Sequence, residues 1–160
     1  MSNRLYIFPI AIVVVIFDQL TKFLVSQELL VGERINLINN IISLTKAYNT
    51  GAAFSILEGK TIILALFSLL VAIAIILYFA LKPIQLPSAL IVAWGLILGG
   101  TIGNMLDRLM LGYVIDFIKL DFINFPIFNI ADISINIGAL LIISCSIAQT
   151  IQEHRQKKTD

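Results

Sequence analysis

The 160-residue sequence has little of what metal and thiol sites need. Its only cysteine, Cys145, cannot form an internal disulfide, and its only histidine, His154, lies in a hydrophilic stretch near the end of the chain. One histidine without a cluster of cysteines cannot supply the usual ligand set of a metal site, so we expect no metal and no other cofactor. Cys145 lies in an apolar run, where a thiol is typically a small buried hydrophobe rather than a nucleophile.

Charge is also scarce. Charged residues make up 13% of the chain and hydrophobic residues 59%, whereas soluble domains have about 25% and about 45–50%. The formal net charge of +1 gives no reason to expect nucleic acid as a partner. The apolar excess is concentrated in four long runs, which favours a lipid bilayer over the core of a soluble domain.

A helix needs about 20 mostly apolar residues to cross the hydrocarbon core of a bilayer. The four runs predict transmembrane helices over about 5–25, 61–81, 88–106 and 131–151. The first run has a basic start, like a secretory signal peptide, but no A-x-A-like cleavage site follows it, so we interpret it as a retained helix. The expected fold is an all-α membrane protein, with one integral membrane domain over 1–160.

Two longer polar segments, about 26–60 and 107–130, join the first helix to the second and the third to the fourth. In the first segment, apolar and polar residues alternate on both sides of Asn39-Asn40, and asparagine tolerates the positive φ of a tight turn. This pattern predicts a small β hairpin with one apolar face, suited to lying on a membrane surface.

Lysine and arginine in the loops indicate the orientation of the helices. Four helices place both termini on one side, which carries five basic residues in about 25, against six in about 70 on the other. The number of basic residues does not favour a cytoplasmic location for the side with the termini, but their density does. We therefore expect both termini to be cytoplasmic and both longer loops to be extracytoplasmic.

Three aspartates lie in mostly apolar surroundings: Asp18, Asp116 and Asp132. An aspartate at the centre of a transmembrane helix costs about 2.5–3.5 kcal/mol, so each is a functional candidate by default. The segments flanking the Asn124-Phe125-Pro126 turn can bring Asp116 and Asp132 together as antiparallel arms. Two neighbouring carboxyl groups tend to share one proton. One can then activate water while the other protonates a carbonyl oxygen, which hydrolyses a peptide without a covalent intermediate.

Alternatives remain open for this pair. Each carboxylate could serve structure alone, and Asp132 is well placed to cap the fourth helix. A transporter that uses carboxylates as a proton relay would favour positions near the midplane and repeat symmetry, whereas these lie near helix ends and no repeat is visible. A chaperone-like membrane protein is a further alternative. A Ser/Lys dyad with Lys22 lacks a specifically placed serine.

Other polar residues cluster at the same expected membrane depth. They are Asp18, Lys22, Asn104, Asp107, Arg108 and Asn129. Asp18 and Lys22 share one face of the first helix, and Asn129 precedes Asp132 by about one turn. These residues support either an active site or only interfacial ion pairs and headgroup anchors. The small residues that follow Asn49 allow a ligand to approach the backbone, or form a plain junction between loop and helix.

Five segments resemble, in order, the signature blocks of bacterial lipoprotein signal peptidase, or signal peptidase II. They are Asp18-Gln19-Leu20-Thr21-Lys22, Asn49-Thr50-Gly51-Ala52-Ala53-Phe54, Gly99-Gly100-Thr101-Ile102-Gly103-Asn104-Met105-Leu106-Asp107-Arg108, Val114-Ile115-Asp116-Phe117 and Phe128-Asn129-Ile130-Ala131-Asp132. One block alone would be weak evidence. Five in order, from the first helix to the fourth, make the resemblance specific.

The resemblance implies a membrane-embedded aspartic endopeptidase. Such an enzyme removes the signal peptide from diacylglyceryl-modified prolipoproteins and cuts just before the lipidated cysteine. Asp116 and Asp132 match the catalytic pair of the family. Its other active-site positions match Asp18, Lys22, Asn49, Gly51, Asn104, Arg108, Asn129 and Ala131.

The resemblance also implies a location and a set of partners. The enzyme would lie in the bacterial cytoplasmic (inner) membrane, with its active site towards the outer face and the hairpin as an extracytoplasmic cradle. Its partners would be lipid-modified prolipoproteins, the bilayer and inhibitors such as the cyclic peptide globomycin. We expect a monomer, since nothing in the sequence calls for an obligate oligomer.

Overall fold

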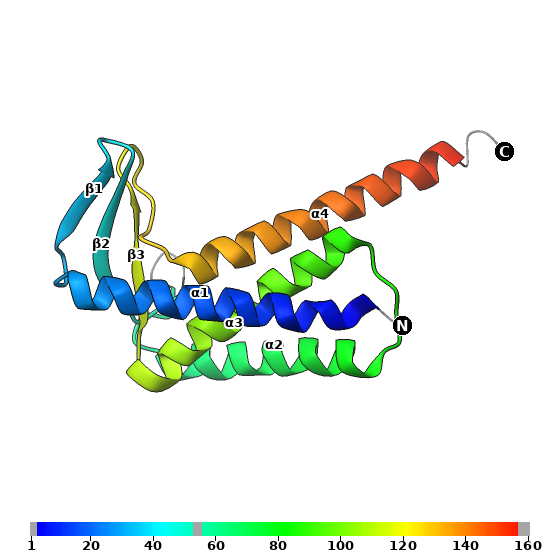
Figure 1. Cartoon of the computed structure of the whole chain (residues 1–160), viewed down its shortest axis with the longest axis horizontal. Coiled ribbons are helices and arrows are strands. Elements are labelled where there is room, and N and C mark those ends of the chain that lie inside the picture. Colours follow the sequence, from blue (N-terminus) through cyan, green and yellow to red (C-terminus); the bar gives the residue numbers. More distant parts are fainter. Residues whose placement is uncertain (1–2, 53–55, 157–160) are drawn as a thin grey trace.

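The computed structural model describes residues 3–52 and 56–156. Ala53 and Phe54 of the small-residue run, and Lys157 and Lys158, which entered the orientation argument, lie outside the described residues. After a short 3-10 helix, Asn3–Tyr6, the elements are α1 Ile7–Glu28, β1 Arg34–Ile38, β2 Ile42–Asn49, α2 Thr61–Leu81, α3 Ser88–Leu111, β3 Val114–Leu120 and α4 Ile130–Gln156 (Figure 1).

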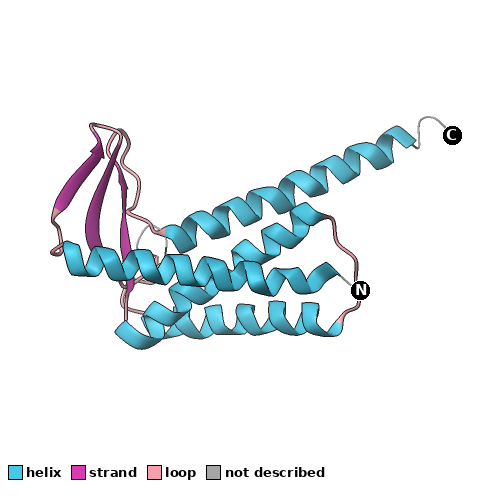
Figure 2. Cartoon of the chain, in the orientation of Figure 1, coloured by secondary structure: helices cyan, strands magenta, loops and turns pink. Residues whose placement is uncertain are grey.

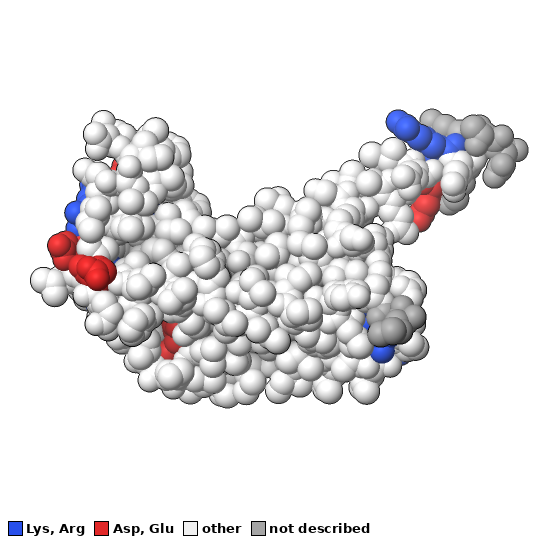
Figure 3. Space-filling view, viewed as in Figure 1, with Lys and Arg blue, Asp and Glu red and all other residues white. Residues whose placement is uncertain are grey.

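Helices α1, α2, α3 and α4 are long and apolar enough to cross a membrane, which confirms the predicted fold class. The β-sheet lies at one end of the helices, and the start of α1 and the end of α4 lie at the other (Figure 2). On the visible face, charged side chains gather at these two ends, and the surface between them is uncharged (Figure 3). An uncharged belt between two charged ends is the arrangement that a bilayer selects.

Three helices extend beyond the ends expected from hydropathy. α1 continues past 25 to Glu28. α3 continues past 106 to Leu111, and α4 continues past 151 to Gln156. Hydropathy detects the part of a helix inside hydrocarbon, whereas the backbone hydrogen bonds continue into the polar zone. Gly112 caps the end of α3: its φ of 81° suits glycine, and its amide donates to the Arg108 carbonyl. This extra turn carries Asp107 and Arg108 towards the sheet.

The predicted hairpin is confirmed. β1 pairs antiparallel with β2, and Asn40 in the connecting turn has a φ of 59°. The sequence analysis missed a third strand, β3, which pairs antiparallel with β2 and completes the sheet order β1-β2-β3. Its pairing brings Asp116 opposite Ala47. The segment has no polar–apolar alternation, and its partner strand lies far away in the sequence, so local patterns did not reveal it.

The chain reverses between β3 and α4. The hydrogen-bonded turn lies at 121–124, just ahead of the predicted Asn124-Phe125-Pro126 turn. After it, Phe128 and Ile118 form an antiparallel bridge, with backbone hydrogen bonds of 2.8 and 3.1 Å. This bridge holds the start of α4 against β3, in the antiparallel arrangement that was predicted to bring Asp116 and Asp132 together.

α3 packs closely against its neighbours because it offers glycines. A Cβ added at Gly99 would lie 2.7 Å from the Ala11 carbonyl oxygen of α1. One at Gly103 would lie 2.5 Å from Asp18 Oδ2, where almost no real Cβ lies. Small residues at such crossings let membrane helices approach through their backbones. At Gly103 this approach brings a carboxylate of α1 directly against α3.

Candidate active site

Asp116 and Asp132 line one cavity of about 220 Å³ at the sheet end of the helices. Asp116 projects from β3 and is 3% exposed, whereas Asp132, in the first turn of α4, is half-buried. Polar side chains of Asn49, Asn104 and Arg108 share the walls with apolar residues of 125–128. The two carboxyl groups thus meet the same enclosed space from different elements.

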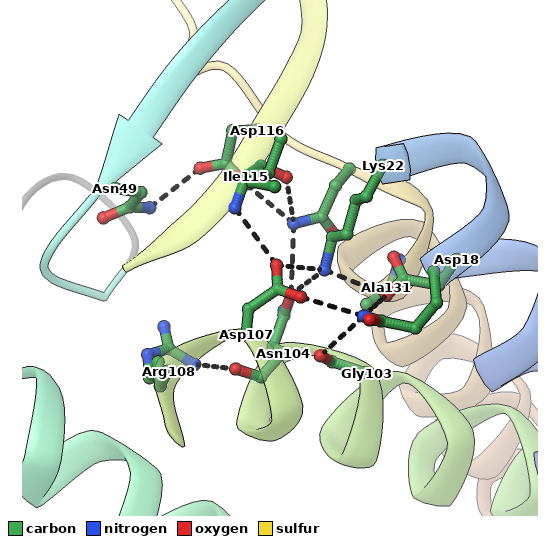
Figure 4. Close-up of polar contacts among 12 residues, drawn as sticks. Asp18, Lys22, Asn49, Gly103, Asn104, Asp107, Arg108, Ile115, Asp116 and Ala131 are labelled. Atoms are coloured by element: carbon green, nitrogen blue, oxygen red, sulfur yellow. Dashed lines mark hydrogen bonds and ion pairs between the residues drawn. The ribbon is translucent and has the colours of Figure 1, made fainter. Parts of the chain in front are cut away.

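Both oxygens of Asp116 accept hydrogen bonds from neutral amides. Asn49 Nδ2 donates to Oδ2 at 2.9 Å (Figure 4). Asn129 Nδ2 donates to Oδ1 at 2.7 Å. Asn49 ends β2, so the β2–β3 pairing positions this donor, while Asn129 comes from the other side of the turn. Neutral donors orient a carboxyl group without fixing a negative charge on it, as an ion pair would.

Asp132 is held by a reciprocal cap at the start of α4. The Asn129 backbone amide donates to Asp132 Oδ2 at 3.1 Å, and the Asp132 amide donates to Asn129 Oδ1 at 3.0 Å. This is the capping-box geometry, with Asn129 as the N-cap and Asp132 at the third helical position. The other oxygen, Asp132 Oδ1, accepts from Asn104 Nδ2 at 2.8 Å. Asp132 therefore stabilises the helix and still faces the cavity.

Asn129 joins the two halves of the site. Its side chain is fully buried, donates to Asp116, accepts from the Asp132 amide and donates to Asn104 Oδ1 at 3.1 Å. Among residues 3–52 and 56–156, neither Asp116 nor Asp132 forms an ion pair. Asn129 therefore binds both carboxyl groups, Asp116 through its side-chain amide and Asp132 through its backbone amide.

A buried lysine lies behind this pair. Lys22 Nζ is 2.9 Å from Asp18 Oδ2 and 2.9 Å from Asp107 Oδ2, and it donates to Asn104 Oδ1 at 3.0 Å (Figure 4). Lys22 is 2% exposed, Asp18 0% and Asp107 3%. The local ion pair between Asp18 and Lys22 is present, but it is buried and shared with Asp107. The alternative of a solvated headgroup anchor is therefore wrong for Asp107, and the three residues form a buried charge cluster.

Both carboxylates of this cluster also accept hydrogen bonds from backbone amides next to Asp116 and Asp132. Asp18 Oδ1 accepts from the Ala131 amide at 2.9 Å, next to Asp132. Asp107 Oδ2 accepts from the Ile115 amide at 3.1 Å, next to Asp116. The charge cluster thus anchors the backbone on both sides of the cavity. Ala131 enters the site through its backbone and its small, fully buried side chain.

Two residues that contribute to these contacts, Gln19 and Asp107, were absent from the predicted site. Gln19 Nε2 donates to Asp107 Oδ1 at 2.9 Å and to Asp18 Oδ2 at 3.2 Å, and Asp107 holds the start of β3. The sequence signal for Gln19 was its place in the first signature block. The sequence alone does not show which face of α1 meets α3, so the contacts of this neutral side chain could not be predicted.

Arg108, which lines the cavity, contacts Gly51 of the neighbouring loop. Arg108 Nη2 donates to the Gly51 carbonyl at 3.0 Å, and the Gly51 amide donates to Asn49 Oδ1 at 2.9 Å. This second bond orients the Asn49 side chain so that its Nδ2 faces Asp116. All ten predicted site residues therefore lie in or directly around one cavity, linked by these contacts.

Burial shifts the titration of the strand carboxyl group. Desolvation, followed by the negative charge of Asp132, raises the pKa of Asp116 from 3.8 to about 7. The hydrogen bonds from Asn49 and Asn129 act in the opposite direction but are weaker. Asp116 can therefore hold a proton close to neutral pH, although coupled carboxyl groups titrate as a pair.

The fold and the site define a class: a multi-pass membrane protein that carries two carboxyl groups in a cavity at one end of its helices. The model of the family described as Signal peptidase (SPase) II matches residues 10–148. Lipoprotein signal peptidases of Staphylococcus aureus strains JH9 and Newman are 38% identical over 143 residues, 88% of this chain and 87% of theirs.

Two solved structures agree with this match. Both are described as bacterial membrane enzyme structures obtained by the in meso method, one at 2.3 Å and one at 1.9 Å. Their TM-scores are 0.82 and 0.76, each at 38% identity, and they cover 88% and 85% of this chain and 87% and 88% of theirs. The chain therefore belongs to the signal peptidase II family, which confirms the resemblance seen in the sequence. Membership makes it a protease of a bacterial membrane.

Proposed function

We propose that this chain is an aspartic endopeptidase that cleaves the signal peptide from diacylglyceryl-modified prolipoproteins just before the lipidated cysteine. Family membership supports the processing of lipoprotein signal peptides. The dyad mechanism and the position of the cut are our proposals. One observation carries the mechanism: Asp116 and Asp132 line the same cavity, are hydrogen-bonded by neutral amides, and have no ion-pair partner among the described residues.

In the proposed reaction, the dyad begins with one proton, on Asp116. Ionised Asp132 takes a proton from a water molecule while the water oxygen attacks the scissile carbonyl carbon. At the same time Asp116 gives its proton to the carbonyl oxygen. The tetrahedral intermediate then collapses, and Asp132 passes its proton to the leaving nitrogen of the cysteine. Asp116 takes a proton back from one hydroxyl group of the intermediate, whose oxygen becomes the carbonyl oxygen of the new carboxyl group. The pair therefore ends as it began, with Asp116 protonated and Asp132 ionised.

The cavities suggest how a substrate lies. A second cavity of about 430 Å³ is lined by the end of β2 and by 124–127, and it shares Asn49, Ala52 and Asp116 with the first. The first cavity also reaches α4. A chain that leaves the membrane along α4 would pass Asp116 on its way to the sheet. Its unpaired backbone groups would find partners in the asparagines and Arg108, which the bilayer cannot provide.

The cleavage itself is testable with purified protein in nanodiscs. We expect a synthetic prolipoprotein carrying a diacylglyceryl cysteine to be cut immediately before that cysteine, as seen by mass spectrometry. Globomycin should inhibit this cut, and the unlipidated peptide serves as the matched control substrate. Cleavage at another bond, or equal cleavage of the unlipidated peptide, would contradict the proposal. A proton flux across vesicles without cleavage would favour the transporter alternative.

We also propose that both termini are cytoplasmic, that the sheet and the cavity lie on the outer side of the cytoplasmic membrane, and that the enzyme acts as a monomer without a cofactor. The sheet would then be the extracytoplasmic cradle expected from the resemblance. The charged ends and the uncharged belt of the surface support a transverse position in the bilayer. Labelling of single cysteines introduced near 36 and near 84 from outside intact cells distinguishes the two orientations.

Cleavage should weaken as the pH rises above about 7. Burial and the charge of Asp132 raise the pKa of Asp116 to about 7, so above that pH the proton that Asp116 must donate is lost. We expect kcat/KM to fall by about tenfold for each further pH unit. The measurement is kcat/KM between pH 5.5 and 9, and a rate that keeps rising up to pH 9 would contradict Asp116 as the acid.

The raised pKa of Asp116 also predicts how the stability of the protein depends on pH. Because the pKa of Asp116 is raised in the folded state, the folded protein binds the proton more tightly than the unfolded chain does. The free energy of unfolding should therefore fall as the pH rises between 3.8 and about 7. Asp116→Asn, which cannot ionise, should remove this part of the pH dependence in thermal unfolding.

A further inference from the structure

Asn136 is a polar side chain in the membrane-spanning part of α4 that the helix itself does not satisfy. By contrast, the hydroxyls of Ser134, Ser144 and Thr150 each donate to a carbonyl of the preceding turn. Asn136 is exposed between two isoleucines, and no hydrogen bond from its side chain to residues 3–52 or 56–156 is present. An amide without a partner is costly at membrane depth, and such a residue is a functional candidate.

Asn136 also lines the cavity of the dyad. It follows Asp132 by four residues, so the two side chains lie on the same face of α4. The helical rise places Asn136 about 6 Å further into the membrane than Asp132. Whatever occupies the cavity below the dyad therefore meets this amide.

From this placement, and resting on the proposed function, we propose that Asn136 binds the backbone of the signal peptide about two residues before the scissile bond. A peptidase requires an extended chain at the cleavage site, and an extended residue spans about 3.3 Å. Two residues therefore cover the distance from Asp132 to Asn136. Asn136 is then a substrate-binding residue that acts beside the dyad without taking part in proton transfer.

The amide chemistry favours a peptide over the lipid as its partner. An extended backbone in hydrocarbon has both an unpaired N–H and an unpaired C=O. The asparagine side chain offers one donor group and one acceptor, which match that pair. The ester carbonyls of a diacylglyceryl group only accept hydrogen bonds and would leave the asparagine oxygen without a partner.

The test compares Asn136→Leu with Ile137→Leu in the nanodisc cleavage assay. Leucine suits a lipid-facing position, so both variants should fold, and thermal unfolding checks this. We expect Asn136→Leu to lower kcat/KM by about tenfold, the effect of losing one or two hydrogen bonds. Ile137→Leu, at the neighbouring lipid-facing position outside the cavity lining, should leave it unchanged. Equal kcat/KM values for Asn136→Leu and the unchanged chain would overturn the proposal.

Two altered substrates identify the group that Asn136 binds. In the first, an ester replaces the amide of the second residue before the cut, which removes its N–H. The unchanged enzyme should cleave this ester substrate more slowly than the amide substrate. The Asn136→Leu variant should cleave the two substrates at nearly the same rate. In the second, ether-linked chains replace the glyceryl esters, and the effect of Asn136→Leu should persist. If that effect vanished with the ether lipid, Asn136 would bind the lipid instead and the proposal would fall. If the unchanged enzyme cleaved no lipidated substrate, the proposed function would fail first, and this inference with it.

Discussion

Replacing Asp116 or Asp132 with asparagine should abolish signal-peptide cleavage and leave the protein folded. Each substitution keeps the shape of the side chain but removes one of the two groups that move protons. General acid–base catalysis contributes about 10²–10⁴-fold, so we expect kcat to fall by at least that factor. The measurement is single-turnover cleavage of the lipidated substrate, with thermal unfolding in parallel.

Asp121→Asn is the matched control for both variants. Asp121 follows β3 closely, accepts from Ser43 and pairs with Arg34, and it lines neither cavity that contains Asp116. It should therefore keep full activity. Loss of folding in the dyad variants would support a purely structural role for the aspartates, and near-normal cleavage by either variant would contradict the dyad mechanism.

The parts of the fold that follow from local patterns were predictable. Long apolar runs specify the four helices because the bilayer demands about 20 apolar residues from each. The Asn39-Asn40 turn specifies the hairpin because few residues tolerate its positive φ. β3 was missed because its stability comes from pairing with β2, some seventy residues earlier in the chain, for example Asn49 with Val114. No local pattern records such a partner.

The site divides in the same way. Asp116 and Asp132 stood out because charged groups among apolar neighbours are costly and need a reason. Their hydrogen-bond partners did not stand out to the same degree. Asn129, rather than Asp132, is the N-cap of α4, and this one side chain also contacts Asp116. Only the packed structure shows that a helix cap and a link between two carboxyl groups are the same residue.

Lys22→Met should destabilise the protein by about 3–5 kcal/mol, because it leaves the carboxylates of Asp18 and Asp107 buried without a cation. The measurement is thermal or denaturant unfolding in detergent. Lys46→Met is the matched control: Lys46 is 9% exposed, but its Nζ donates only to the backbone carbonyls of Ser26 and Leu29. Its loss leaves no buried charge and should cost less. Equal costs for the two variants would contradict this account of the cluster.

A triple variant separates charge balance from geometry. Lys22→Met combined with Asp18→Asn and Asp107→Asn removes all three buried charges, so much of the lost stability should return. Activity should not return with it. Lys22 Nζ and Asn129 Nδ2 both donate to Asn104 Oδ1, which directs Asn104 Nδ2 towards Asp132. Without the ammonium group, one of the two donors that fix this amide is gone, and Asp132 loses its orienting partner. A triple variant that is both stable and fully active would show that the cluster serves packing alone.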